Sequence, residues 1–430
     1  MEQVDGIRLQ KFRQLKKEIR GSDEFLIVGI DVAKERHNAF FGTAAGKTLH
    51  KGLFFENTIE GFQKLLAITE ALKIRNDLAN VVFGLEPTAN YHKPLGEHLI
   101  ECGHMVVLVA GAAVKHNRML LDGRWDKHDT KDSANIADLI CQGKFLHYEY
   151  PDPKMQDLRN LLALKRQLKK EEHGLKVRIR NQLLAQYFPE MDRHFGTAVS
   201  MTVVGRCLDP SIIAGMEFDE FRRNVATGRM TIAQQKLLQA IWRAAPESIG
   251  CHVGEEVLFE AKVMVSKLHQ ARETIKEVKD KIEDLCIEFP EYQCLLSIPG
   301  FGPDVSSKVL GAIGNPFRFI SGKQVLKMAG FDLCANRSGK TSNSAMPVIS
   351  KQGKADISYA LYQAAFIAST HNKGFMTYYT NKLRGRQKEK GIGTKMRVKL
   401  AAKLLVIAWT LMKKKEPFDS KYLNKGDTIV

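Results

Sequence analysis

The feature that most limits what this chain can fold into is an apolar run that ends at a single carboxylate. Phe25-Leu-Ile-Val-Gly-Ile-Asp31 has no polar residue before its last position. A run of this length without polar alternation predicts a strand that is buried on both faces. A carboxylate at its end is costly to desolvate unless a cation compensates for it, so Asp31 is a candidate metal ligand. The plainer alternative is a strand that ends at an exposed aspartate.

A second run, Asn80-Val-Val-Phe-Gly-Leu-Glu86, also stops at a carboxylate. Hydrophobic patterns and turn signals predict, in chain order, strands at 25–31, 36–42 and 48–55, a helix that Thr58 caps, a strand at 80–86, a helix at 91–102, a strand at 105–109 and a helix at 130–142. This is the element order expected of a ribonuclease H-like α/β domain, here residues 25–150. Residues 1–24 are expected to form a basic helical extension that buries little surface.

Four carboxylates stand at the ends of these predicted elements. Asp31 ends the first strand and Glu86 the fourth, while Asp129 and Asp132 begin the last helix, on one face of its first turn. Converging carboxylates would repel one another without a cation, and hard oxygen ligands suit Mg²⁺ or Mn²⁺. Two such ions about 3.5 to 4 Å apart would activate a nucleophile and stabilise the leaving oxygen of a phosphodiester. Alternatively, Asp129 and Asp132 only complement the positive end of a helix.

The charge of the chain favours a polyanionic partner such as nucleic acid. Lys and Arg outnumber Asp and Glu by 65 to 48, which gives a formal net charge of +17. A basic loop follows residue 121, and a long basic helix is expected at about 155–187. The candidate phosphate contacts in these segments are Arg124, Lys127, Lys165, Arg166, Lys169, Arg178 and Arg180.

Two other classes of protein are not indicated. No apolar run approaches the roughly 20 residues that a membrane-spanning helix needs. The seven cysteines are scattered without close pairs, so neither a zinc site nor a disulfide framework is expected. We therefore expect a soluble intracellular protein with reduced thiols and no membrane partner.

Residues 151–292 are predicted to form a helical, coiled-coil region. Pro151 and Pro153 mark a linker before the long basic helix, and short amphipathic pieces follow at 188–248. An apolar seam with four-three spacing then comprises Val257, Ala261, Met264, Leu268, Ala271, Ile275, Val278, Ile282, Leu285 and Phe289. Pairing within one chain and pairing between chains both fit this pattern.

Residues 293–430 are predicted to be helical, beginning with a helix-hairpin-helix around Ile-Pro-Gly300-Phe-Gly302. Turn amides at Gly300 and Gly302 could hold a phosphate, and a plain helical hairpin is the alternative. Further on, Ser338 is either an ordinary turn residue or a nucleophile that a neighbouring cation helps to ionise. The candidate phosphate contacts of this region are Arg337, Lys340 and Lys351. The basic segment 381–427 is expected to contain a packed helix with a phosphate-facing surface.

Five motifs in this order resemble the DEDD transposases of bacterial insertion sequences, a group that includes the pilin-gene invertase and bridge-RNA-guided recombinases. The motifs are Gly-Ile-Asp31-Val-Ala-Lys, Glu86-Pro-Thr-Ala-Asn-Tyr, Asp129-Thr-Lys-Asp132-Ser-Ala, Ile-Pro-Gly-Phe-Gly302, and Ala-Gly330-Phe-Asp through Ser338-Gly to Ile-Ser350-Lys-Gln-Gly353. The resemblance extends from Phe25 to Ser369. The sequence departs from the usual family pattern at Ala89, Leu333 and Lys354, which affects loop geometry but removes no proposed ligand.

The resemblance implies that Asp31, Glu86, Asp129 and Asp132 form the divalent-metal site of a RuvC-like domain. It also implies that Ser338 attacks the DNA phosphate and forms a phosphoserine-linked intermediate. The implied partners are donor and target DNA, a structured non-coding guide RNA, and further copies of the chain in a homodimer or homotetramer with a composite site. The implied location is the bacterial cytoplasm, in association with the nucleoid.

Two other functions fit the same residues. A metal-dependent junction-resolving endonuclease would use the carboxylates with water as the nucleophile. A non-catalytic scaffold for nucleic acid would use them as helix-terminal charges. A Ser338→Ala protein that still cuts DNA at full rate favours the first, and divalent-ion binding that Asp31→Asn leaves unchanged favours the second.

Overall fold

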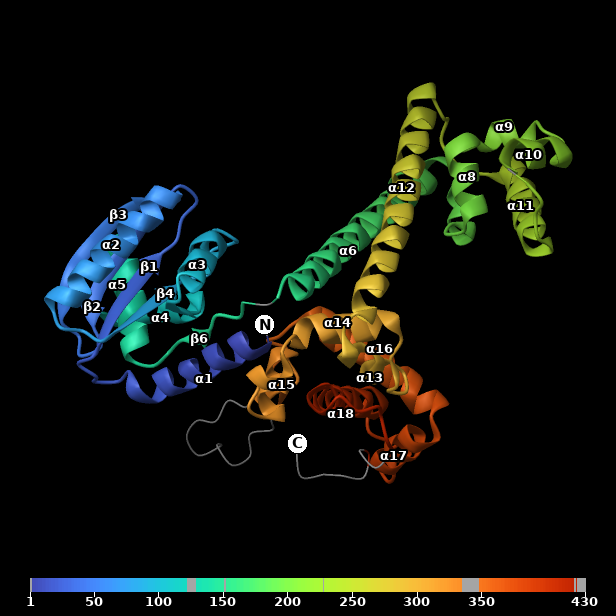
Figure 1. The fold of residues 1–430 in the computed structure, drawn as a ribbon. Coiled ribbons are helices and arrows are strands. Elements are labelled where there is room, and N and C mark those ends of the chain that lie inside the picture. Colours follow the sequence, from blue (N-terminus) through green and yellow to red (C-terminus); the bar gives the residue numbers. More distant parts are fainter. Residues whose placement is uncertain are drawn as a thin grey trace. The chain divides into compact units, whose positions relative to one another are not determined.

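The computed structural model of the chain describes residues 2–121, 129–150, 152–226, 228–334, 348–420 and 423. The chain divides into two compact units, Met1–Asp152 and Pro153–Val430. The first is an α/β unit, and the second is largely helical (Figure 1). This agrees with the predicted fold class of an α/β domain followed by helical regions.

The sheet of the first unit has the strand order β3-β2-β1-β4-β5-β6. Its strands are β1 (Phe25–Asp31), β2 (Arg36–Thr43), β3 (Thr48–Glu56), β4 (Asn80–Leu85), β5 (Met105–Leu108) and β6 (Leu146–His147). The first three form an antiparallel meander, β4 and β5 continue parallel to β1, and β6 is antiparallel to β5. This mixed sheet, with β1 inside it, is consistent with the predicted ribonuclease H-like domain.

Helices cover both faces of this sheet (Figure 1). They are α1 (Glu2–Glu18), α2 (Ile59–Arg75), α3 (His92–Glu101), α4 (Gly111–Leu121) and α5 (Asp129–Cys141). On β1, Leu26, Val28 and Ile30 pack in a core with α2 and α3, whereas Ile27 packs in a second core with α1, α4 and α5. Burial on both faces explains why the run 25–31 has no polar alternation.

The structure corrects the expectation that residues 1–24 are an appendage. Leu9, Leu15 and Ile19 are buried, and the ring of Phe12 meets that of Phe145 edge-on with 5.7 Å between centroids. A few apolar residues are enough to bury this helix, because they lie on one of its faces and pack on a core that the sheet already forms. α1 is therefore part of the first unit.

The second unit begins with a pair of long helices, α6 (Pro153–Arg178) and α12 (Glu255–Ile287), which pack against each other within one chain (Figure 1). α6 ends in a π-helical turn, η1 (Ile179–Leu184). The predicted seam lies on α12, but it belongs to two cores, since Met264 and Leu268 join one and Val278 and Ile282 join the other. The seam is thus divided rather than a continuous coiled-coil interface.

The insertion between these helices folds into a helical cap. It comprises α7 (Ala185–Tyr187), η2 (Pro189–His194), α8 (Ala198–Arg206), α9 (Pro210–Ala214), α10 (Phe218–Val225), α11 (Ile232–Ala244) and η3 (Ala245–Glu247). Its core includes Phe188, Val204, Phe221 and Ile241, and it also takes in the first half of the α12 seam. The short amphipathic pieces predicted at 188–248 therefore pack around a core that they share with α12.

The remaining elements include the last long helix, and most of the others pack against it. They are α13 (Pro290–Leu296), α14 (Pro303–Ile313), η4 (Pro316–Arg318), α15 (Gly322–Met328), β7 (Leu333–Cys334), β8 (Val348–Ile349), α16 (Ala355–His371), α17 (Lys373–Leu383) and α18 (Ile392–Lys414). Leu400, Leu404 and Leu411 of α18 are fully buried in the same core as α13, α14 and α16. Among the helices that the structure describes, none has the length and apolar character to cross a membrane.

Candidate active site

Asp31 and Glu86 stand at the ends of two adjacent parallel strands. The last pair in the β1–β4 register is Ile30 with Leu85, so Asp31 is the last residue of β1 and Glu86 directly follows β4. Side chains alternate between faces along a strand, and both acids therefore point to the face that α5 covers. Both residues are half-buried. The sheet thus brings two carboxylates to one edge and one face.

α5 lies close to this face because both strands carry a glycine beneath it. Gly29 of β1 and Gly84 of β4 are register partners. A Cβ on Gly29 would lie 2.6 Å from the amide nitrogen of Ala137, and a Cβ on Gly84 would overlap the side chain of Ile140. A larger residue at Gly29 would push the helix backbone away from the sheet. The glycines of the two apolar runs therefore set the height of α5 above the strands.

Two hydrogen bonds fix the direction of α5. Ser133 Oγ donates to Asn38 Oδ1 at 2.6 Å, and Asn38 is the register partner of Asp31 at the carboxyl end of β1. At the other end of the helix, Cys141 Sγ donates to the Thr43 carbonyl at 3.6 Å. Burial raises the pKa of the Cys141 thiol to about 11, so it remains a protonated donor. α5 therefore runs antiparallel to β1, with its first turn at the acid-bearing edge.

That first turn carries the other two predicted acids, Asp129 and Asp132. The side chain of Asp129 lies outside the described residues. Asp132 is 2% exposed, and Arg118 Nη2 of α4 lies 2.6 Å from its Oδ1. The N–H groups of this guanidinium are not aligned on the oxygen, so within the described chain Oδ1 is buried without a hydrogen bond. Asp132 is thus balanced by a charge but incompletely satisfied.

A buried polar network that no sequence motif indicated holds Arg118 in place. Asn117 Nδ2 donates to Asn135 Oδ1 at 2.6 Å and to Asp138 Oδ2 at 2.7 Å. Asn117 and Asn135 are both buried. Because these bonds tie α4 to α5, they keep the neighbouring guanidinium of Arg118 beside Asp132.

His37 also contributes to this site, although no sequence motif indicated it. Its ring is fully buried, and its Nδ1 accepts a hydrogen bond from the Ala33 amide at 3.2 Å. Burial lowers the pKa of His37, so the ring is neutral at neutral pH, with its proton on Nε2. The bond holds the turn that follows Asp31.

The donor set at this edge fits a hard divalent cation. It consists of carboxylates only, as Mg²⁺ and Mn²⁺ prefer, and Asp132 offers a buried oxygen without a hydrogen bond. The Glu86 carboxylate lies close to Gly111 of α4, since a Cβ on that glycine would lie 2.7 Å from Glu86 Oε1. The described side chains contain no group of three or more acids, histidines or cysteines that could hold a metal ion. The side chain of Asp129 is not one of the described side chains.

The predicted nucleophile and several predicted phosphate contacts fall on residues that the structure does not describe. These are Ser338, Arg337, Lys340, Arg124 and Lys127. The structure describes instead the two strands that flank residues 335–347, namely β7 and β8, which pair antiparallel.

The base of this hairpin is held backbone against backbone. The Ser350 amide donates to the Asp332 carbonyl at 2.8 Å, and Ser350 Oγ donates to Asp332 Oδ1. A Cβ on Gly353 would overlap the amide nitrogen of Gly330. Lys351 is exposed here, and its φ of 55° is a left-handed conformation that a non-glycine residue rarely adopts. The motif residues on either side of the serine segment therefore form one compact clamp.

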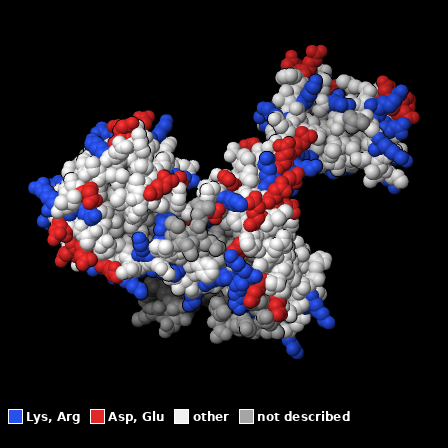
Figure 2. Space-filling view, in the orientation of Figure 1, with Lys and Arg blue, Asp and Glu red and all other residues white. Residues whose placement is uncertain are grey.

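The five cations of α6 and η1 that were predicted to bind nucleic acid are each paired with an acid of the same chain. The ion pairs are Lys165 with Asp304 (2.6 Å), Arg166 with Asp356 (3.1 Å), Lys169 with Glu172 (2.7 Å), Arg178 with Glu260 (3.2 Å) and Arg180 with Asp192 (2.6 Å). Lys165 is also buried. Figure 2 shows Lys and Arg mixed with Asp and Glu along this helix pair. In the described structure four of these cations pair with acids of other elements, and Lys169 pairs within α6.

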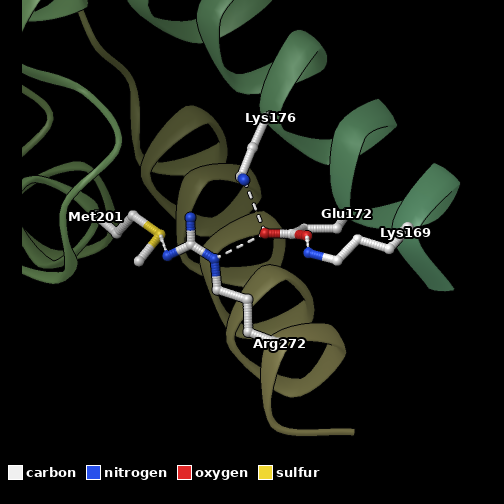
Figure 3. Close-up of polar contacts among 5 residues, drawn as sticks. All are labelled: Lys169, Glu172, Lys176, Met201 and Arg272. Atoms are coloured by element: carbon white, nitrogen blue, oxygen red, sulfur yellow. Dashed lines mark hydrogen bonds and ion pairs between the residues drawn. The ribbon is translucent and has the colours of Figure 1, made fainter. Parts of the chain in front are cut away.

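Glu172 is the centre of the largest of these networks (Figure 3). It accepts hydrogen bonds from Lys169 at 2.7 Å and Arg272 at 3.1 Å, and Lys176 forms an ion pair with it at 2.7 Å. Burial alone would raise the pKa of Glu172, but the hydrogen bonds from the three cations outweigh it and lower the pKa to about 2. Arg272 also lies 2.9 Å from Met201 Sδ. The cluster thus joins α6, α12 and α8 where the apolar seam divides.

The two glycines of the predicted helix-hairpin-helix differ in their surroundings. Gly300 has a φ of 90°, and a Cβ on it would overlap the Ala364 carbonyl, so it allows close packing on α16. Gly302 caps the amino end of α14, and a Cβ on it would meet no atom within 4 Å. Of the two, Gly302 borders open space.

Comparison with known proteins identifies the class of enzyme to which this fold belongs. Residues 28–189 match a DEDD family described as "Transposase", and residues 292–380 match one described as "Transposase IS116/IS110/IS902 family". The chain is therefore a transposase, an enzyme of DNA transposition. It belongs to the IS110 family, with a DEDD amino-terminal domain followed by the carboxy-terminal transposase domain of that family.

The chain is also similar to a full-length relative, the "Insertion element IS110 uncharacterized 43.6 kDa protein" of Streptomyces coelicolor. The two are 23% identical over 407 residues, which cover 93% of this chain and 96% of the relative. The similarity therefore spans both units.

Proposed function

We propose that this transposase excises and inserts a mobile element by metal-assisted DNA cleavage and a phosphoserine-DNA intermediate, guided by a structured RNA. The observation that carries the proposal is the shared edge and face of Asp31 and Glu86 beneath the first turn of α5. A bound Mg²⁺ or Mn²⁺ would polarise the scissile phosphate and stabilise the leaving oxygen there.

In this proposal Asp31, Glu86, Asp129 and Asp132 bind the cation. Asp132 would exchange the Arg118 guanidinium for the cation, since the two compete for the same buried oxygen. Arg118 would then be free to bind a non-bridging oxygen of the DNA phosphate, a role that suits its planar donor groups. His37 and Asn38 would act only by holding the turn and the helix that carry the acids.

Ser338 is the proposed nucleophile. Its Oγ loses a proton and forms a bond to phosphorus, while the bond from phosphorus to one deoxyribose oxygen breaks and that oxygen leaves as a hydroxyl. Attack of a different DNA hydroxyl on the phosphoserine reverses the chemistry and joins the new strand, with no net loss of phosphodiester bonds. The clamp of Gly330, Asp332, Ser350 and Gly353 supports this role because it fixes both ends of the segment that contains Ser338.

The proposed partners are donor DNA, target DNA and a structured non-coding RNA that selects them by base pairing. The net charge of +17 supports polyanionic partners such as DNA and RNA. We propose a homodimer or homotetramer that acts on the nucleoid in the bacterial cytoplasm.

The test uses the full-length protein with Mg²⁺, the element's own non-coding RNA, and labelled donor and target DNA, followed by denaturing gels with and without protease. A protein-linked DNA band that protease removes is expected for the wild-type chain. Ser338→Ala and Asp31→Asn should each abolish it. Ser342→Ala, in the same segment, and Asp77→Asn, at an exposed residue of the first unit, are the matched controls and should keep it.

The alternatives give different gels. Free cut ends without a protein adduct, unchanged in Ser338→Ala, would assign the chain to metal-dependent nucleases that use water. DNA binding without any cleavage, together with Mg²⁺ binding that Asp31→Asn leaves unchanged, would assign it to non-catalytic scaffolds.

A further inference from the structure

In the second unit, the excess of basic over acidic residues is largest at the hairpin between α17 and α18. From Lys373 to Lys399 the sequence has nine Lys or Arg and a single acid, Glu389. The turn at 384–391 is exposed throughout, and Lys395 and Lys399 on the first turns of α18 are exposed as well. We give the name basic tip to five exposed cations of this hairpin: Arg384, Lys388, Lys390, Lys395 and Lys399.

The charges of the basic tip are not neutralised as those of α6 are. Arg386 donates two hydrogen bonds of 2.8 Å to Glu389, the single acid of this hairpin. Lys388, Lys390 and Lys399 form no ion pair with any residue that the structure describes. By contrast, the predicted phosphate contacts of α6 and η1 each have an acid within 4.0 Å. The tip therefore keeps its positive charge available to a partner.

The basic tip is also held in shape before any partner binds. The Arg397 guanidinium lies over two rings, 4.8 Å from the centroid of Phe366 on α16 and 5.2 Å from that of Tyr379 on α17. The Tyr379 hydroxyl donates to the Gly393 carbonyl at 3.3 Å. These contacts join the start of α18 to two other helices. A surface that needs no ordering on binding loses less entropy to its partner.

We infer that the basic tip binds the phosphate backbone of duplex DNA. Unpaired lysines carry a charge that phosphates can neutralise with release of counterions, which is the main source of non-specific affinity for DNA. Residues 384–399 include no aromatic side chain, so the tip offers no ring on which an unpaired base could stack. The inference rests on the DNA binding that membership of the transposase family implies, and it does not depend on which residue is the nucleophile.

The test is a triple variant, Lys388→Gln/Lys390→Gln/Lys399→Gln, in the full-length chain. Its Kd for a labelled 25-base-pair DNA duplex is measured by fluorescence anisotropy at several salt concentrations, with no cleavage step. Loss of three phosphate contacts should weaken binding at least about tenfold near 0.1 M salt. It should also lower the slope of log K against log salt concentration by about 2 to 3.

A matched control removes the same charge from α12. Lys262, Lys276 and Lys279 are exposed and form no ion pair with a residue that the structure describes. Lys262→Gln/Lys276→Gln/Lys279→Gln should change the slope by less than about 1, because general loss of net charge acts only weakly at this ionic strength. Equal circular dichroism spectra establish that both triple variants fold.

Two results would overturn the inference. One is an equal loss of affinity and slope in the tip and control variants, which would make the effect one of net charge alone. The other is a tip variant that binds the DNA duplex normally but loses affinity for an RNA duplex of the same sequence, which would assign the surface to RNA. Ser338→Ala should bind DNA with the wild-type slope, so failure of the proposed nucleophile leaves this test intact.

Discussion

Gly29 of β1 and Gly84 of β4 are register partners in the sheet, and α5 packs directly on both. Asp31 and Glu86 each follow one of these glycines by two residues, at the end of β1 and directly after β4. Because α5 also carries Asp129 and Asp132, the distances among the acids depend on two positions that have no side chain. The packing of one helix on two glycines thus controls the geometry of the candidate active site.

Gly29→Ala tests this dependence. The added Cβ would overlap the Ser133 carbonyl and lie 2.6 Å from the Ala137 amide nitrogen, both of which belong to the helix backbone and cannot rotate away. We expect the free energy of unfolding of the first unit to fall by about 3 kcal/mol. DNA cleavage should fall further than stability alone explains, because α5 moves away from Asp31. Hydrogen exchange of the β1 amides and a cleavage assay at a temperature where the variant is folded measure the two effects.

Gly6→Ala in α1 is the control, since a Cβ there would meet no atom within 4 Å. It should leave cleavage unchanged and raise helix stability by up to about 1 kcal/mol. Normal cleavage by Gly29→Ala would show that cleavage does not depend on the distance between α5 and the sheet.

Arg118→Gln tests whether Asp132 is a metal ligand or only an acid that pairs with Arg118. Removing the guanidinium leaves a buried carboxylate without a counter-charge, which should lower the free energy of unfolding by about 3 kcal/mol in EDTA. If Asp132 binds a divalent cation, Mg²⁺ should restore most of this loss and raise the melting temperature of the variant more than that of the wild-type chain. Thermal melts with EDTA and with MgCl₂ measure the difference.

The double variant Arg118→Gln/Asp132→Asn is the companion measurement. It has no unbalanced charge, so it should be more stable than Arg118→Gln in EDTA and should gain little from Mg²⁺. A single variant that Mg²⁺ does not stabilise would indicate that Asp132 only pairs with Arg118.

The central sheet and the positions of the acids on it could be predicted because local sequence specifies them. A strand buried on both faces needs a continuous apolar run, so residues 25–31 and 80–86 could be recognised with their terminal carboxylates. β1 and β2 begin where the pattern placed them, and α5 begins one residue before the predicted helix at 130–142. The glycine within each run was visible too, but its role depends on α5, which is more than 40 residues away in the sequence.

Features that depend on a distant partner could not be predicted. α4 mixes apolar residues with Asn117 and Arg118, whose buried partners Asn135 and Asp132 lie on another helix. In the same way, Lys165 looks like a phosphate contact until Asp304 is brought beside it by folding. A lysine on a helix has the same local pattern whether it faces an acid or solvent, so the sequence could not distinguish the paired cations of α6 from those of the basic tip.

Glu172 predicts a specific dependence of stability on pH. Its folded pKa of about 2 lies below the ordinary value of 4.5, so its contribution is fully present above pH 4.5 and is lost as the pH falls toward 2. The shift corresponds to a contribution on the order of 3 kcal/mol. Glu172→Gln should therefore destabilise the α6–α12 pair by about that amount at pH 7, and the difference from wild type should shrink between pH 4.5 and 2. Urea unfolding at pH 7, 5 and 3.5 measures this.

Glu171→Gln is the matched control for Glu172, because the neighbouring residue is exposed and accepts a hydrogen bond from Gln167 on the same helix. Its effect should stay within about 0.5 kcal/mol at every pH. A loss in Glu172→Gln that is the same at pH 7 and 3.5 would mean that the carboxylate contributes by packing and not by charge.

Gly353→Ala tests whether the clamp positions the proposed nucleophile. The added Cβ would overlap the Gly330 amide nitrogen and lie 2.6 Å from the Ala329 carbonyl carbon, so the two ends of the serine segment must separate. A displacement of about 1 Å at a reacting group can cost about 100-fold in rate, and we expect a loss of that size in the yield of protein-linked DNA. DNA affinity and Mg²⁺ binding should stay at wild-type levels because the acids and the basic tip are on other elements.

Gly174→Ala in α6, where a Cβ meets no atom within 4 Å, is the control and should form the adduct normally. A Gly353→Ala protein that folds and forms the adduct at full yield would show that the clamp has no part in positioning Ser338.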